Sequence, residues 1–179
     1  MKTPKRKSSP HLDISPGLKQ IEIASLACEL LAFVMADAPI KKLVAKYSRF
    51  GIGTVYDFHK EKRVLQLLIQ IAAIYRLASW RLKGKQKLQE EKTCVGQLGT
   101  DGKDELVDLS MHEACNKIIH ANELVIEGRK VTKRPLTYLR DIIHAQGEHR
   151  GVGWYAQIWI PEFCEAAIMI PWANPDIPF

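Results

Sequence analysis

Val64–Trp80, VLQLLIQIAAIYRLASW, is the most apolar stretch of the chain and sets the expected fold. Its apolar residues cover most faces of a helix that we expect over about 54–83, and such a helix is buried against several partners or against a second subunit. Gln66, Gln70 and Arg76 interrupt the stretch, so it falls short of the ~18 apolar residues that a membrane-spanning helix needs. We therefore predict a central core helix, a homodimer and no membrane partner.

Helices are also expected on the N-terminal side of this stretch. Pro16 stands at a favourable first-turn position after Ser15, and apolar residues recur at helical spacing up to about residue 36. The tripeptide DAP at 37–39 is expected to end this helix. A second short helix is expected over 40–49.

On the C-terminal side the pattern changes. The charged run GKQKLQEEK and three glycines predict a mobile loop over 84–103. A helix over 106–121 and a short strand over 124–126 follow. Alternating patterns at 136–146 and 154–160, separated by GEHRGVG, predict a β-hairpin, and a last helix is expected over 161–171.

These elements predict a mainly α fold, a helical bundle with a small C-terminal antiparallel β-hairpin inserted over about 136–160. We expect a single domain over 16–179, preceded by a disordered basic tail over 1–15. That tail is interpreted either as a solubilising terminus or as a contact for nucleic acid.

The net charge gives little support to nucleic-acid binding by the whole domain. The chain has 26 basic and 20 acidic residues, a formal charge of +6, and four of the basic residues lie in the first seven positions. Without these four, 22 basic residues face 20 acidic ones, so the body of the protein is nearly neutral.

The cysteines and the N-terminus favour the cytoplasm. Cys28, Cys94, Cys115 and Cys164 are widely spaced and form no CxxC pair, which argues against a disulfide scaffold and against a zinc site. The N-terminal segment has basic residues but no following apolar region of signal-peptide type. We expect a cytoplasmic protein that needs no metal or other cofactor.

One helix carries a pattern that suggests chemistry. Ser110 and Glu113 have the spacing of a capping box, which sets the start of a helix. In that register His112, Asn116 and His120 share a stripe, beside an expected apolar seam of Cys115, Ile118 and Ile119. Imidazoles transfer protons near neutral pH, so this stripe is the candidate catalytic site.

The string EACNKIIHA, Glu113–Ala121, resembles the signature helix of the HEPN superfamily. The resemblance implies an all-helical, often dimeric bundle that cleaves RNA without metal, in a bacterial defence or toxin context. Asn116 matches the polar position and His120 the histidine, which implies a proton-transfer role for His120, an orienting role for Asn116 and an auxiliary role for His112. Cys115 stands at the arginine position, and a thiol lacks the charged planar fork that binds phosphate.

Two other interpretations stay open. In the first, the same helix builds a dimer or hetero-complex interface of a non-catalytic interaction module, with Asn116 and His120 as buried structural groups. In the second, aromatic and basic residues near the hairpin form a platform for single-stranded nucleic acid or lie in the core. The residues concerned are Arg140, His149, Arg150, Trp154, Tyr155 and Trp159. Arg140 and His144 are expected on one face of a strand.

Overall fold

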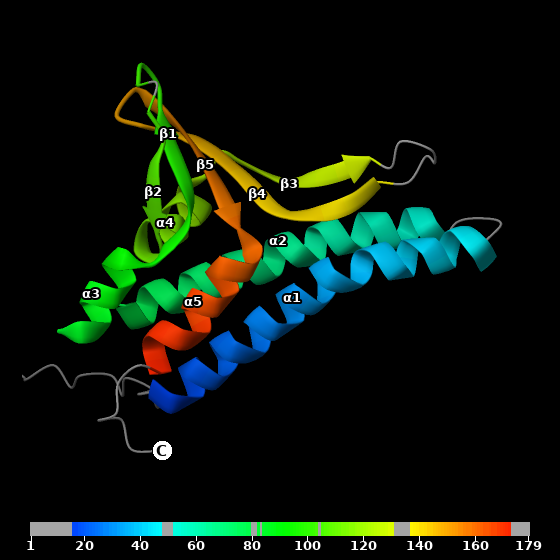
Figure 1. Cartoon of the computed structure of the whole chain (residues 1–179), viewed down its shortest axis with the longest axis horizontal. Coiled ribbons are helices and arrows are strands. Elements are labelled where there is room, and N and C mark those ends of the chain that lie inside the picture. The colour runs from blue at the N-terminus through cyan, green and yellow to red at the C-terminus, as the bar shows by residue number, and fades with distance from the viewer. Residues whose placement is uncertain are drawn as a thin grey trace, which may run out of the picture.

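The computed structural model describes residues 16–47, 52–79, 82, 84–103, 105–130 and 137–172, so the expected tail over 1–15 lies outside the described residues. Helices and an antiparallel sheet share one core, and the expectation of a mainly α helical bundle is wrong: the fold is mixed α/β (Figure 1). The elements in chain order are α1 (Pro16–Tyr47), α2 (Ile52–Ser79), α3 (Lys85–Lys92), β1 (Cys94–Thr100), β2 (Val107–Ser110), α4 (Met111–His120), β3 (Glu123–Lys130), β4 (Thr137–His149), β5 (Val152–Trp159) and α5 (Ile160–Trp172).

The described strands form one five-stranded antiparallel sheet in the order β2-β1-β5-β4-β3. The predicted hairpin is confirmed: β4 and β5 pair from Ile142 opposite Trp159 to His149 opposite Val152. Its two-residue turn has φ of 53° at Arg150 and 77° at Gly151, the positive values that match the twist of paired strands. The predicted strand over 124–126 is confirmed as part of β3.

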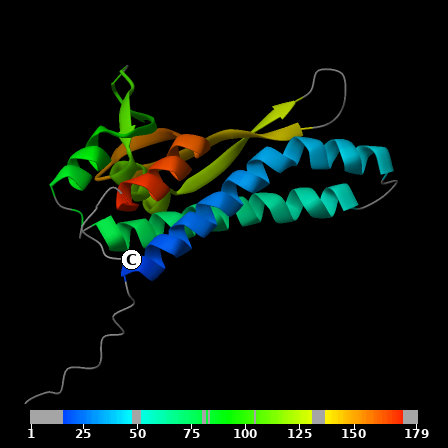
Figure 2. The ribbon, with the colours of Figure 1, turned by 60° about the horizontal axis from the view of Figure 1, so that its bottom comes forward.

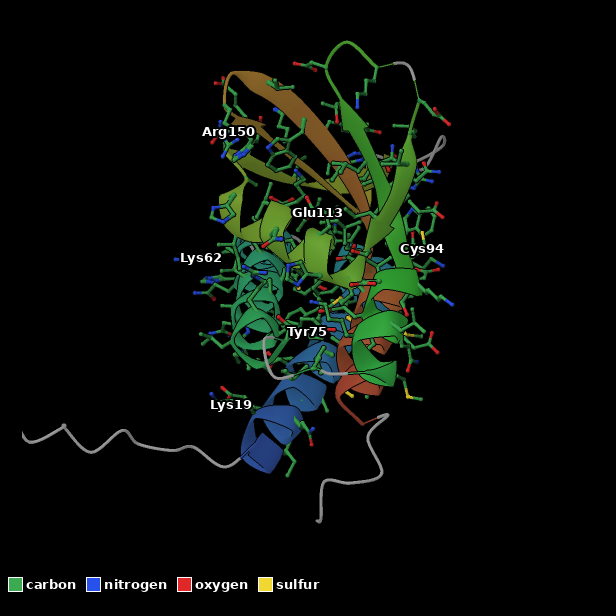
Figure 3. The ribbon with its side chains drawn as sticks, turned by 90° about the vertical axis from the view of Figure 1, so that its left-hand side faces the viewer. Lys19, Lys62, Tyr75, Cys94, Glu113 and Arg150 are labelled. Atoms are coloured by element: carbon green, nitrogen blue, oxygen red, sulfur yellow. The ribbon has the colours of Figure 1, made fainter. Side chains whose placement is uncertain are left out.

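One face of the sheet packs on the helices. Ile143 and Ala145 of β4 and Ala156 and Ile158 of β5 are fully buried, while the residues that alternate with them are exposed or half-buried. Helix α4 lies between this face and α2, and α1 and α2 run side by side beneath it (Figures 1 and 3). The alternation gives the sheet one face toward the helices and one open face, because each strand presents successive side chains to opposite faces.

The predicted central helix is confirmed as α2, whose Val64, Leu67, Leu68 and Ile71 are fully buried. Burial on nearly every face is not confirmed, since Leu77 remains 61% exposed.

The predicted mobile loop over 84–103 is wrong, because this segment forms α3 and β1. The two glycines within β1, Gly96 and Gly99, lie close to neighbouring chain segments. A Cβ atom on Gly96 would lie 1.9 Å from the Gln157 carbonyl oxygen, so only glycine lets β1 approach β5 at this point. The predicted helix over 106–121 is correct for α4 but wrong for 107–110, which forms β2.

The predicted break at 37–39 is also wrong, because α1 runs through these residues with Pro39 inside it. Asp37 is fully buried and binds two partners: Lys60 Nζ at 2.9 Å from Oδ1 and the Leu139 backbone N–H at 2.7 Å from Oδ2. Tertiary contacts of this kind outweigh the local tendency of proline to interrupt a helix. The predicted C-terminal helix over 161–171 is confirmed as α5.

Among the described helices, the segment Lys19–Leu43 of α1 is long and apolar enough to cross a membrane by length and composition alone. Its Ile23, Ala27 and Leu30 are buried in the core of the molecule. This arrangement is compatible with a soluble protein.

Candidate functional site

Helix α4 begins where the capping box predicts. Ser110 Oγ accepts the Glu113 backbone N–H at 3.3 Å, while the Glu113 carboxylate contacts Asn116 Nδ2 at 3.4 Å and Lys117 Nζ at 3.3 Å. The buried face consists of Met111, Ala114, Cys115 and Ile118. The predicted burial of Cys115 and Ile118 is therefore confirmed, whereas the predicted burial of Ile119 is wrong, since this side chain is 40% exposed.

The register of α4 brings His112 to a junction of three helices. Its Nε2 atom lies 2.7 Å from Arg76 Nη1 of α2, and its Nδ1 atom lies 3.6 Å from Glu90 Oε1 of α3. Arg76 Nη1 also lies 3.4 Å from Nδ1, and because a guanidinium only donates, the nearer Nε2 is the acceptor when the imidazole is neutral. The His112 side chain is 42% exposed and Arg76 is half-buried, so solvent reaches the imidazole of this pair.

Buried acidic groups lie behind His112. Glu90 is 3% exposed, and burial raises the pKa of its carboxyl, with the nearby His112 acting in the opposite direction. Tyr75 is 1% exposed and lies among the helices (Figure 3), and burial, then the Glu90 charge, raises the pKa of its phenol. Neither Glu90 Oε1 nor the Tyr75 hydroxyl makes a hydrogen bond of normal geometry. Buried polar atoms without a hydrogen-bond partner are uncommon in proteins. Groups with strongly shifted pKa values cluster at functional sites.

Cys115, the residue at the arginine position of the HEPN pattern, is fully buried. Burial is the main cause that raises the pKa of its thiol, followed by the Glu90 charge, whereas Arg76 acts in the opposite direction. The thiol therefore stays protonated and buried, which makes it a packing residue and not a nucleophile.

The other two predicted site residues lie elsewhere. Asn116 is half-buried and bonds to Glu113, and His120 is exposed at the C-terminal end of α4. The rise of a helix separates His112 from His120 by about 12 Å. The structure thus places the three predicted residues on one stripe but brings only His112 against charged groups of other helices.

Sequence reasoning missed Arg76, Glu90 and Tyr75. The signal for Arg76 was its place in the most apolar stretch, where a charged residue needs a partner. Glu90 was missed because it lies in the charged run GKQKLQEEK, which is typical of a solvated loop. Each of these two contacts joins residues that are distant in the sequence.

The open face of the sheet carries a second polar group. Arg140 donates to the Glu127 carboxylate, and His144 Nε2 lies 3.4 Å from the other Glu127 oxygen, so the prediction that both share a strand face is confirmed. The bond from Arg140 is the main cause that lowers the pKa of Glu127. The Tyr155 ring stacks on His144 with centroids 6.3 Å apart, whereas Trp154 lies in the core under Lys117 Nζ, 4.5 Å from its ring. Glu127 neutralises Arg140, which weakens this face as a platform for nucleic acid.

In the part of the chain that the structure describes, no group of three or more His, Cys, Asp or Glu side chains could hold a metal ion. The chain matches no family model, no curated protein and no solved structure. The candidate site therefore depends on its own chemistry: a guanidinium and an imidazole in contact at the surface, with a carboxylate and a phenol buried behind them.

Proposed function

We propose that this protein acts on RNA in the cytoplasm as a homodimer and cleaves it without a metal ion at the contact between Arg76 and His112. The observation that carries the proposal is the 2.7 Å contact between Arg76 Nη1 and His112 Nε2, with the buried Glu90 carboxylate on the other side of the imidazole. A fixed cation beside a proton-transfer group is what metal-independent phosphodiester cleavage requires.

The chemistry follows from the position of each group. Arg76 turns from the imidazole to a phosphate oxygen and offsets the negative charge that grows on it. The freed His112 Nε2 takes the proton of a ribose 2′-hydroxyl, whose oxygen forms a bond to phosphorus. The bond from phosphorus to the 5′-oxygen breaks, that oxygen takes a proton from a water molecule, and the hydroxide left behind takes the proton from the His112 imidazolium. Glu90 stabilises the imidazolium that forms.

The choice of RNA depends on the resemblance of Glu113–Ala121 to the HEPN signature helix. Cys115 cannot supply the cation of that pattern, and Arg76 of the neighbouring helix α2 supplies one beside His112 of α4. Asn116 and His120 lie further along α4, away from the contact between Arg76 and His112, so neither takes part in the cleavage step.

The proposal is tested with a labelled single-stranded RNA in the presence of EDTA. The native protein is expected to cleave it, and His112→Ala and Arg76→Ala each lose about 100-fold or more in rate. His120→Ala is the matched control on the same helix and keeps cleavage within a few-fold of native. If His112→Ala cleaves as fast as native protein, the proposal fails; if His120→Ala alone abolishes cleavage, the proton-transfer role belongs to His120.

The second candidate is a non-catalytic interaction module, favoured by the way in which Arg76, Glu90 and His112 join α2, α3 and α4. Under this function His112→Ala lowers the melting temperature and no variant changes an RNA readout. The native protein would then leave the RNA intact in EDTA and in Mg²⁺ alike.

A further inference from the structure

Helix α1 has an uncharged face that points away from the core. Its residues, here called the outer stripe, recur at helical spacing and are exposed: Ile21, Ser25, Cys28, Ala32, Met35 and Pro39. The two largest apolar members, Met35 and Ile21, are 76% and 60% exposed. Among the described residues, no helix or strand crosses in front of α1 in Figure 2. An exposed apolar patch of this length marks an interaction surface.

The outer stripe is unusual because α1 carries apolar residues both on its buried face and on its exposed face. The segment Lys19–Leu43 is apolar enough for a membrane, yet only 22% of its most apolar 18 residues are buried. A spanning position would carry the buried Asp37 and Lys41 of this same segment into hydrocarbon and break the ion pair from Asp37 to Lys60. Another protein surface therefore suits the stripe better than a bilayer.

Two pairs of exposed residues in α1 are spaced equally about Ala32, an arrangement that fits a second copy. Ile21 and Leu43, both exposed and apolar, are equally distant from Ala32, and so are Ser25 and Pro39. In an antiparallel pair of α1 helices with its twofold axis at Ala32, these residues face one another. Ala32 is small, which lets the two backbones approach at the axis, and Met35 of each helix lies within one turn of it.

Charge agrees with the antiparallel direction. Exposed Glu22 lies near the N-terminal end of the stripe and exposed Lys42 near its C-terminal end, equally far from Ala32. An antiparallel pair brings Glu22 of one helix to Lys42 of the other, whereas a parallel pair brings Glu22 to Glu22 and Lys42 to Lys42.

We infer that the outer stripe of α1 is the homodimer interface of this protein, formed by an antiparallel pair of α1 helices with Ala32 at the twofold axis. The inference is independent of RNA cleavage, because Arg76 and His112 of each subunit are in contact within one chain.

The first test is the mass of the full chain in solution, by sedimentation equilibrium at micromolar concentration. The native protein is expected at twice the chain mass of 20.3 kDa. Met35→Glu is expected to be monomeric with an unchanged circular dichroism spectrum, because a charge in the stripe cannot be desolvated. Met169→Glu, at an exposed methionine of α5, is the matched control and stays dimeric. A native monomer, or a Met35→Glu dimer, would overturn the inference, as would a monomer that binds lipid vesicles through Met35.

The second test is disulfide formation under mild oxidation in a Cys28→Ser background. Ala32→Cys is expected to give a covalent dimer in high yield, since the two residues meet at the axis. Ser25→Cys is the control, because an antiparallel pair separates its two copies by about 21 Å along the helices, far beyond disulfide reach. Equal yields from both variants, or none from Ala32→Cys, would contradict the antiparallel arrangement.

Discussion

The carboxylate of Asp37 accepts the backbone N–H of Leu139 at 2.7 Å, across 102 residues of sequence. Its other oxygen binds Lys60 Nζ at 2.9 Å, and both side chains of this ion pair are buried. One carboxylate thus links α1, α2 and β4.

We expect Asp37→Ala to lower the free energy of unfolding by about 3–5 kcal/mol, because it removes the buried carboxylate that pairs with the buried Lys60 charge and accepts the Leu139 N–H. Urea unfolding monitored by circular dichroism measures the loss. Glu29→Ala is the control: it breaks the half-exposed pair of Glu29 and Arg63 on the same two helices and costs about 1 kcal/mol or less. Equal losses in the two variants would show that burial does not decide the cost.

Gly96 and Gly99 of β1 make a matched pair for the close approach of β1 to β5. A Cβ atom on Gly96 meets the Gln157 carbonyl oxygen at 1.9 Å, whereas one on Gly99 meets the side chains of Leu106 and Tyr155 at 3.1 Å. The side chains near Gly99 can change rotamer, whereas the Gln157 backbone near Gly96 is held in place by strand pairing. We expect Gly96→Ala to cost about 2 kcal/mol or more and Gly99→Ala clearly less, measured by urea unfolding. A larger loss for Gly99→Ala would refute this account of β1.

Glu90 makes the stability of the fold depend on pH. Burial raises its folded pKa above the ordinary 4.5, so its contribution is fully present below the ordinary value and is lost as pH rises through the folded pKa. Glu90→Gln removes the buried charge, and we expect it to raise the melting temperature by a few degrees at pH 8, with the difference vanishing near pH 4. Exposed Glu91→Gln is the control and shows no such dependence. A Glu90→Gln protein that is less stable than native at pH 8 would contradict this sign.

Sequence patterns predicted those parts of the fold that depend on local periodicity. The helical spacing of α2, the alternation of β4 and β5 and the cap at Ser110 each depend on neighbours along the chain, and each is confirmed. Strand β1 was missed because its glycines indicate a loop when the partner strand is unknown. The proline at 39 indicated a helix end for the same reason, since the Asp37 contacts that stabilise α1 there come from distant residues.

The candidate site was predicted only in part. The stripe of His112, Asn116 and His120 follows from the register of α4. Residues on one stripe of a helix need not contact the same groups of neighbouring helices. His112 differs from the other two because it contacts Arg76, 36 residues earlier, and Glu90. Glu90 lies on α3, which the charged run had indicated to be a loop. Contacts of this kind depend on tertiary packing, which no helical period encodes.

The central claim is that Arg76 and His112 form one catalytic unit. Its most direct test is the initial rate of RNA cleavage in EDTA for native protein, Arg76→Ala, His112→Ala and the double variant. Groups that act as a unit are not additive, so we expect each single variant to lose about 100-fold or more and the double variant to be scarcely slower than either. Native protein that leaves the RNA intact, or a His112→Ala rate equal to native, would contradict the claim.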